Sequence, residues 1–123
     1  MTPASVVLYQ KDAGTATVLA NRLREHLPSV HLARTCDEIR PTIAQHRARV
    51  LVLDLENSCL EEVERLHEEF PALSIVCTHR LADEELWTAA LSEGAADICE
   101  SGNTDDIVRS VLCEQRRALT AAA

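Results

Sequence analysis

The sequence has few basic residues and no long apolar run. Its 12 Lys and Arg stand against 20 Asp and Glu, which gives a net charge of −8 at pH 7. This charge opposes attraction to phosphate backbones and anionic lipid, so we expect no direct nucleic-acid binding and no membrane association. No apolar stretch approaches the roughly 20 residues that span a bilayer, and the first residues lack the basic and apolar regions of a secretory signal. We therefore expect a cytoplasmic protein.

The sequence also lacks the patterns of metal sites and of common enzymes. Its five cysteines form no CxxC pair and no Cys/His cluster with zinc-finger spacing. There is no Gly-rich phosphate loop, nucleophile elbow or pair of catalytic carboxylates, so we expect neither an enzyme nor a cofactor. Cys77 and Cys99 end apolar runs and are expected to be buried. A reactive, redox-sensing thiol remains an alternative for Cys59, which lies in an expected loop.

The apolar residues that are present form five short runs separated by helical patterns. The runs cover residues 5–9, 30–33, 50–55, 73–78 and 96–99. Helical periodicity covers residues 18–27, 35–46, 60–70 and 82–94, and a fifth helix opens at Asn103 or Thr104. Continuous apolar strands that alternate with helices are typical of a parallel sheet covered on both faces. We predict an α/β fold with a doubly wound, five-stranded parallel sheet of the (βα)5, flavodoxin-like type.

Single residues mark the expected helix ends. Pro28 and Pro71 are expected to stop the first and third helices. Gly94 stands where a helix C-cap is expected. Pro41 must lie early in the second helix or break it, because it donates no backbone hydrogen bond.

Polar residues gather at the carboxyl ends of the predicted strands. In an open parallel sheet, ligands and chemistry collect at this edge, near the point where the strand order reverses. The residues there are Gln10, Lys11, Asp12, Asp54, Thr78, His79, Glu100 and Ser101.

Three segments follow one another in order: LVLDL with its strand-end aspartate, SIVCT with its strand-end threonine, and EGAADICESG. In these segments the sequence resembles the receiver domain of bacterial two-component response regulators, over essentially the whole chain. The resemblance implies that Asp54 is the aspartate that accepts a phosphoryl group from a histidine kinase. It implies that Thr78 is the hydroxyl that closes over that group. A carboxylate that caps the following turn is the alternative for Asp54.

The sequence departs from this family at the presumed metal site. Gln10 and Lys11 stand where the family has two carboxylates that hold Mg²⁺ together with the phosphoacceptor. Asp12 follows directly, and a one-residue bulge would make it a substitute ligand. A second interpretation pairs the Lys11 ammonium with Asp54, which would lock one conformation without phosphate. A Lys11 that points into solvent is the alternative.

Further departures lie around the presumed phosphoryl group. Ser101 replaces the lysine that pairs with the phosphoryl oxygens, and a hydroxyl supplies no positive charge. Ile98 replaces the aromatic residue whose rotation reports the switch. His79 replaces a small residue that leaves room for the phosphoryl donor. The loop after the third strand is short and lacks the family's Met-Pro turn.

We therefore expect residues 1–123 to form one atypical receiver domain, a pseudo-receiver, which acts in signal transduction through protein–protein interactions and without phosphorylation. It is either a whole protein or the N-terminal part of a longer regulator. The alternative is a functional receiver that a histidine kinase phosphorylates on Asp54, with Mg²⁺ held by Asp12 and Asp54, and that controls a transcriptional output. An unrelated enzyme on the same sheet lacks any supporting motif.

The expected partner surface lies on the fourth helix, the fifth strand and the fifth helix, because this face commonly forms dimers or contacts effectors in the family. Here it would carry Trp87, Leu91 and Arg109, together with Arg116 and Arg117. Trp and Arg are enriched in binding hot spots, so Trp87 is a candidate anchor of a homodimer or an effector contact. The alternative is a Trp87 that packs on the sheet as a core residue.

Overall fold

Strands and helices alternate along the chain, as the sequence predicts. The computed structural model describes residues 5–122, with side chains as far as residue 118. The strands are β1 Ser5–Tyr9, β2 Ser29–Ala33, β3 Val50–Asp54, β4 Ser74–His79 and β5 Asp97–Glu100. The helices are α1 Ala13–Arg24, α2 Cys36–His46, α3 Leu60–Glu69, α4 Glu84–Ser92 and α5 Thr104–Ala122, and a 3-10 turn, η1, spans Leu55–Asn57. None of the helices described is both long and apolar enough to cross a membrane.

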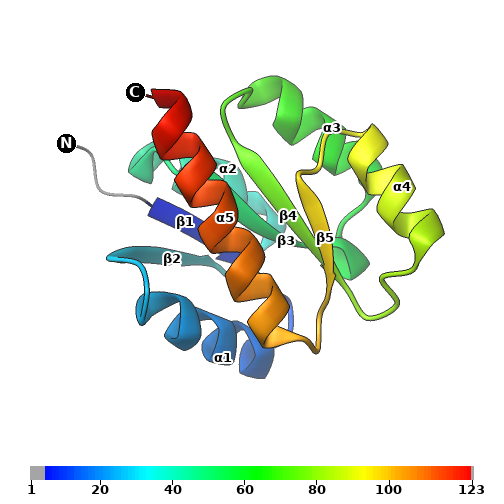
Figure 1. The fold of residues 1–123 in the computed structure, drawn as a ribbon, viewed down its shortest axis with the longest axis horizontal. Helices are drawn as coiled ribbons and strands as arrows, with labels where there is room; N and C mark the ends of the chain where they lie inside the picture. The colour runs from blue at the N-terminus through cyan, green and yellow to red at the C-terminus, as the bar shows by residue number, and fades with distance from the viewer. Residues whose placement is uncertain (1–4, 123) are drawn as a thin grey trace.

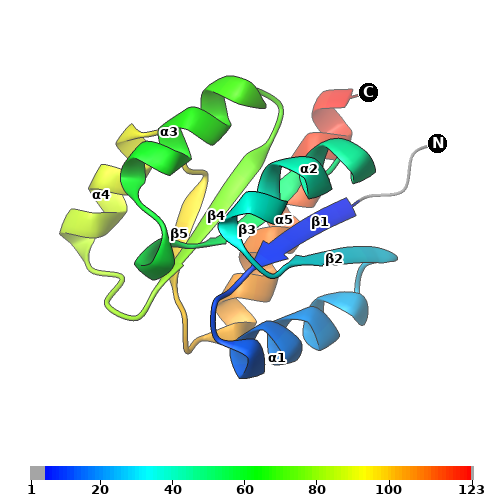
Figure 2. The same ribbon diagram turned by 180° about the vertical axis from the view of Figure 1, so that it is seen from behind.

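The strands form one parallel sheet in the order β2-β1-β3-β4-β5. Helices α1 and α5 cover one face, and α2, α3 and α4 cover the other (Figures 1 and 2). Because a crossover helix returns each strand to the same direction, alternating elements produce this parallel arrangement. The predicted doubly wound, flavodoxin-like fold is therefore confirmed. The strand order reverses between β1 and β3, which places the switch point beside Asp54.

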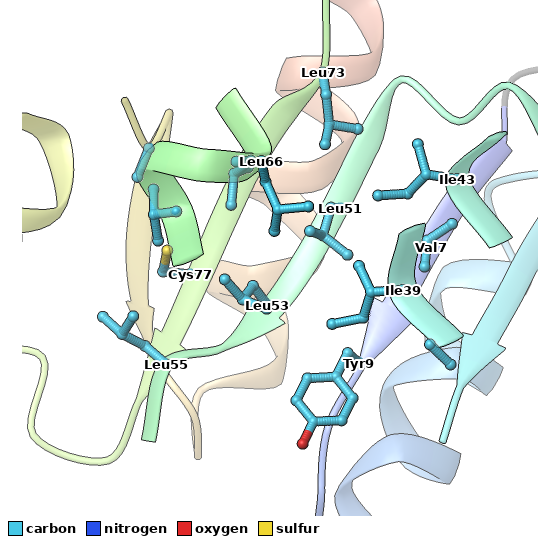
Figure 3. Packing of buried hydrophobic residues seen from close by; sticks show 14 of the residues in the cluster. Val7, Tyr9, Ile39, Ile43, Leu51, Leu53, Leu55, Leu66, Leu73 and Cys77 are labelled. Atoms are coloured by element: carbon cyan, nitrogen blue, oxygen red, sulfur yellow. The ribbon is translucent and has the colours of Figure 1, made fainter. Parts of the chain in front are cut away.

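The central strand β3 is buried on both of its faces. Val50 and Val52 pack toward α1 and α5, whereas Leu51 and Leu53 pack toward the opposite helices, and all four are 0% exposed. Figure 3 shows Leu51 and Leu53 in the core cluster between the sheet and helices α2, α3 and α4, with Ile39 of α2 beside them. Successive strand residues face opposite sides of a sheet, so burial on both sides explains the uninterrupted apolar run. This packing fixes the position at which the strand ends on Asp54.

Two helices differ from the prediction. α1 begins at Ala13, well before the apolar stripe, because Asp12 caps it and accepts the backbone N–H of Thr15 at 2.8 Å. Pro41 lies inside α2, and the helix continues to His46. The expectation that Pro41 lies early in the helix or breaks it is wrong. Pro41 is on an exposed face, where water can reach the carbonyl that lacks an N–H partner.

The first helix ends earlier than expected, because α1 stops at Arg24 with Glu25 as its C-cap, four residues before Pro28. The remaining expected helix ends are confirmed. α3 ends just before Pro71, and Gly94 follows the C-cap of α4 with a φ of 108°, in the left-handed region. The backbone carbonyl of Asn103 accepts the N–H of Ile107, and its side chain accepts the N–H of Asp106 at 3.2 Å. Of the two candidates for the N-cap of α5, Asn103 is therefore the one that acts.

Candidate functional site

Asp54 stands at the carboxyl edge of the sheet, between the ends of β1 and β4. It is the last residue of β3, it pairs in register with Thr78 of β4, and it is 7% exposed. A carboxylate at this depth requires hydrogen-bond partners, because burying an unpaired charge is costly.

Three N–H groups satisfy the Asp54 carboxylate. Its Oδ2 accepts the backbone N–H of Lys11 at 3.1 Å and the side-chain amide of Asn57 at 2.7 Å. Its Oδ1 accepts the backbone N–H of Glu56 at 3.1 Å. Asp54 thus caps η1 and ties the β1–α1 loop to the β3–α3 loop. The capping role considered from the sequence is confirmed, and hydrogen bonds to an ionised acceptor are among the strong ones.

The two positions on either side of Asp54 contact each other. The side-chain amide of Gln10 donates a hydrogen bond to the Thr78 hydroxyl at 2.8 Å. Gln10 is 6% exposed and Thr78 is 0% exposed, so this bond is shielded from water. The structure therefore brings together Gln10, Asp54 and Thr78, as the predicted strand ends require.

Lys11 and Asp12 lie beside this cluster and differ from the prediction. The Lys11 ammonium is exposed and forms none of the ion pairs found among residues 5–118. The interpretation that pairs it with Asp54 is therefore wrong, and the alternative, an exposed Lys11, is the one found. The backbone N–H of Lys11 makes the contact instead, because the chain turns it toward the carboxylate. Asp12 is turned toward α1, where its carboxylate accepts the hydroxyl of Thr15 at 2.7 Å as well as the backbone N–H. These hydrogen bonds, the side-chain one first, hold the pKa of Asp12 below its ordinary value.

Three residues of this edge were not anticipated from the sequence. Asn57 holds Asp54 as described, and the thiol of Cys36 lies 3.6 Å from the Asn57 carbonyl oxygen. Glu56 accepts the backbone N–H of Arg80, and thereby connects η1 to the β4–α4 loop. An asparagine three residues after a strand-end aspartate was the one available signal, because Asp and Asn commonly form such local turns.

His79 and Ser101 lie on the far side of the site. The Nδ1 atom of His79 accepts the backbone N–H of Leu81 at 2.9 Å, and it lies 4.0 Å from a Glu56 carboxylate oxygen. The backbone N–H of Ser101 donates to the His79 carbonyl at 3.0 Å. Ile98 is 7% exposed and belongs to the core cluster beneath α4.

The residues predicted for a partner surface occupy the outer side of α4 and α5. Trp87 is 46% exposed, and the α4 residues that pack on the sheet are Leu86 and Ala90, so a Trp87 that serves as a core residue is excluded. Leu91 is half-buried. Arg109 of α5 is exposed and pairs with Asp106 on the same helix at 3.2 Å.

Solved structures share the fold of this chain. The signal receiver domain of a putative LuxO repressor protein from Vibrio parahaemolyticus superposes with a TM-score of 0.86, at 17% identity over 99% of this chain and 96% of that chain. A CheY-like receiver domain protein from Methanospirillum hungatei gives 0.83 at 16% identity, over 97% and 98%. An orphan response regulator of H. pylori gives 0.82 at 13% identity, over 93% and 98%. The chain has the receiver fold.

The likeness to these receiver domains lies in the fold, because the sequence identities are low. No family model matches the sequence. No curated protein matches it either. Asp54 and Thr78 pair in register on the adjacent strands β3 and β4, and Ser101 directly follows β5.

The Mg²⁺ ion that the receiver fold implies does not fit the residues present here. Mg²⁺ prefers an octahedral set of oxygen ligands. Both oxygens of Asp54 already accept protein N–H groups, the amide of Gln10 is bound to Thr78, and Asp12 caps α1. Within the part of the chain that the structure describes, no three His, Cys, Asp or Glu side chains form a group that could hold a metal ion.

Proposed function

We propose that this chain is a receiver-type interaction domain that works in signal transduction without phosphorylation of Asp54. The observation that supports this proposal is that the Asp54 carboxylate already accepts hydrogen bonds from the N–H groups of Lys11, Glu56 and Asn57. An oxygen that attacks a phosphoryl group must be free to approach it in line. Here three of the roughly four lone-pair sites of the carboxylate already accept N–H groups, which hinders that approach.

The charges around Asp54 support the same proposal. Phosphoryl transfer depends on cations that neutralise the charge developing on the phosphoryl oxygens. Gln10 replaces a carboxylate with an amide that is already committed to Thr78. Ser101 supplies a hydroxyl where receivers of the family have an ammonium. The edge thus lacks two means of stabilising a phosphorylated state, and its own hydrogen bonds hold one conformation instead.

A domain without phosphoryl chemistry acts through its surface, and we assign that role to the outer side of α4 and α5. Trp87 is a large side chain left 46% exposed, so its ring is available to a partner. Leu91 and Arg109 complete this surface, and aromatic and arginine side chains contribute most to binding hot spots. The partner is a protein, either a second copy of the chain or an effector.

The test of the first part is the intact mass of the protein after incubation with acetyl phosphate and Mg²⁺. We expect no phosphoryl adduct on the parent chain. A variant with Gln10→Asp, Lys11→Asp and Ser101→Lys restores the missing groups, and it is the positive control. Asp54→Asn in the background of that variant should abolish any adduct.

An adduct on the parent chain that disappears in Asp54→Asn would overturn the proposal. It would support the alternative, in which a histidine kinase phosphorylates Asp54 and the domain controls a transcriptional output. Such a result would mean that the phosphoryl donor displaces N–H groups that bind Asp54.

The test of the second part is sedimentation equilibrium over a range of protein concentrations. We expect self-association that Trp87→Ala weakens by about tenfold or more, in keeping with an interface anchor. Val18→Ala is the matched control, because Val18 is an equally exposed apolar residue, 52%, on α1. Equal effects of both variants, or a monomer at all concentrations, would exclude the homodimer and leave an effector as the partner.

A further inference from the structure

A second feature lies next to Asp54, on the outer side of β1. A cavity of about 250 Å³ opens between the β1–α1 loop, α1 and the end of β2. Figures 1 and 2 place α1 alongside β2, so the cavity lies where the helix meets the carboxyl edge of the sheet. Its walls include Ala13 and Ala16 of α1 and Ala33 of β2. Three small side chains at this junction leave the space open.

Two cations line the same cavity. Lys11 belongs to the β1–α1 loop, and Arg34 is the first residue after β2. Among residues 5–118, neither charged group takes part in an ion pair, whereas Arg22, Arg40 and Arg80 each do. Arg47 and Arg49 also appear in none of these ion pairs, so what distinguishes Lys11 and Arg34 is that both line one cavity.

The nearby carboxylates are committed elsewhere. Asp12 accepts two hydrogen bonds from Thr15 at the start of α1. Glu38 accepts the backbone N–H of Arg34 at 2.5 Å, and so it holds the backbone of that residue instead of its guanidinium. The cations at the cavity therefore remain available to a ligand.

We propose that this cavity binds a small organic anion, with Lys11 and Arg34 on its carboxylate or phosphate group and the alanine walls around a short apolar part. Ligand sites are typically apolar hollows with a few convergent polar groups, and their volumes run from about 300 Å³ upward. A cavity of about 250 Å³ therefore selects a small ligand. The guanidinium of Arg34 suits an anionic group with two oxygens, because its N–H groups form a planar fork.

The ligand would act on the site around Asp54 through the backbone. Lys11 carries the N–H group that Asp54 accepts, and the preceding residue, Gln10, holds Thr78. An anion that fixes the Lys11 side chain therefore stabilises the segment that closes over Asp54. This inference rests on the proposed function, since it gives the domain an input that replaces phosphorylation.

The test is a titration of the ¹⁵N-labelled chain, followed by amide chemical shifts, with inorganic phosphate, acetate and butyrate as separate probes. We expect saturable shifts at Ala13, Ala16 and Ala33, and tighter binding of butyrate than of acetate. Lys11→Gln and Arg34→Gln should each weaken binding by at least about tenfold, since each removes a charge-assisted hydrogen bond. Arg65→Gln removes the same charge from an exposed position on α3, so it is the matched control.

Non-saturating shifts, or equal weakening in the control and the two cavity variants, would overturn the proposed site. Butyrate and acetate that bind equally would overturn the role of the alanine walls. The amides of Glu56 and Asn57 report the coupling, and saturable binding without a shift at either would overturn the connection to Asp54.

The phosphorylation test separates this inference from the proposed function. The titration contains no phosphoryl donor and no Mg²⁺. Anion binding in a chain that also forms a phosphoryl adduct would overturn phosphorylation independence and leave the cavity site in place. No binding in a chain that forms no adduct would overturn the cavity site alone.

Discussion

The amide nitrogen of Gln10 lies 2.8 Å from the Thr78 hydroxyl oxygen, although the two residues belong to strands that are not neighbours. β3 separates β1 from β4, so this hydrogen bond passes from one side of the Asp54 strand to the other. An ionised carboxylate at residue 10 could only accept a hydrogen bond, whereas the amide donates one. Gln10 therefore donates to the Thr78 hydroxyl, and it brings no negative charge to the site.

The first prediction concerns this hydrogen bond. Gln10→Ala should lower the free energy of unfolding by about 1–3 kcal/mol, because it leaves the buried Thr78 hydroxyl without its partner. Urea denaturation measures the change. Gln45→Ala on the exposed side of α2 is the control, and it should stay within about 0.5 kcal/mol of the parent.

A double-mutant cycle isolates the contact. If Gln10 and Thr78 interact as described, Gln10→Ala should lower the free energy of unfolding much less in a Thr78→Val background than in the parent. Equal decreases in the two backgrounds would mean that the effect of Gln10→Ala comes from lost packing alone.

The second prediction is a pH dependence set by His31. Its ring stacks on that of His46, with the ring centroids 3.4 Å apart. Burial first, and then the nearby His46 and Arg24, hold the pKa of His31 below the ordinary 6.5. The unfolded chain therefore binds a proton at a higher pH than the folded chain does. The stability should be full above about pH 6.5 and should fall as the pH drops below that value.

Urea denaturation between pH 5 and pH 8 checks this dependence. His46→Gln should reduce the loss of stability at low pH, because it removes a second ring that can carry charge beside His31. His26→Gln, at an exposed position on the other face, should leave the change of the free energy of unfolding with pH as it is in the parent. If His31→Gln shows the same change with pH as the parent, the pH dependence comes from other groups.

The third prediction concerns the five thiols. Burial is the main cause that raises the pKa of both Cys77 and Cys99 to about 12, so these two should stay protonated and unreactive. Cys36, Cys59 and Cys113 are exposed. Titration of the folded protein with a chromogenic disulfide at pH 8 should therefore detect three thiols, and titration in denaturant should detect five.

Single substitutions check the assignment. Cys113→Ser should lower the count in the folded protein by one, whereas Cys77→Ser should change only the count in denaturant. A fast-reacting fourth thiol in the folded parent would mean that β4 and β5 open readily.

Much of the fold was predictable because it follows from local patterns. The apolar run of β3 indicates burial on both faces, and Gly94 marks a left-handed turn that few other residues adopt easily. The register of parallel strands then brings Asp54 and Thr78 together, so the positions of the candidate site also followed from the strand ends.

The contacts within the site were not predictable in the same way. Charge alone favoured a pair between the Lys11 ammonium and Asp54, but the turn after β1 presents the backbone N–H of Lys11 instead. A sequence pattern does not tell which group of a residue faces its neighbour. Trp87 is a similar case, because Leu86 and Ala90 fill the inner side of α4 and leave the larger ring outside.

The last prediction compares two glycines. A Cβ atom at Gly94 would lie 2.7 Å from Cγ of His67, and the residue has a φ of 108°. Gly94→Ala should therefore lower the free energy of unfolding by about 1–3 kcal/mol, through backbone strain and the clash with His67. A Cβ atom at Gly102 would meet nothing within 4 Å, so Gly102→Ala should leave the stability unchanged or raise it by up to about 1 kcal/mol.

His67→Ala separates the two causes at Gly94. In a His67→Ala background, Gly94→Ala should lower the free energy of unfolding by less, because the clash is absent and only the strain from the positive φ remains. An equal decrease in both backgrounds would mean that the whole effect comes from the backbone. If Gly94→Ala proved as stable as Gly102→Ala, the left-handed turn would not be needed to connect α4 to β5, and the close contact between α3 and that turn would be wrong.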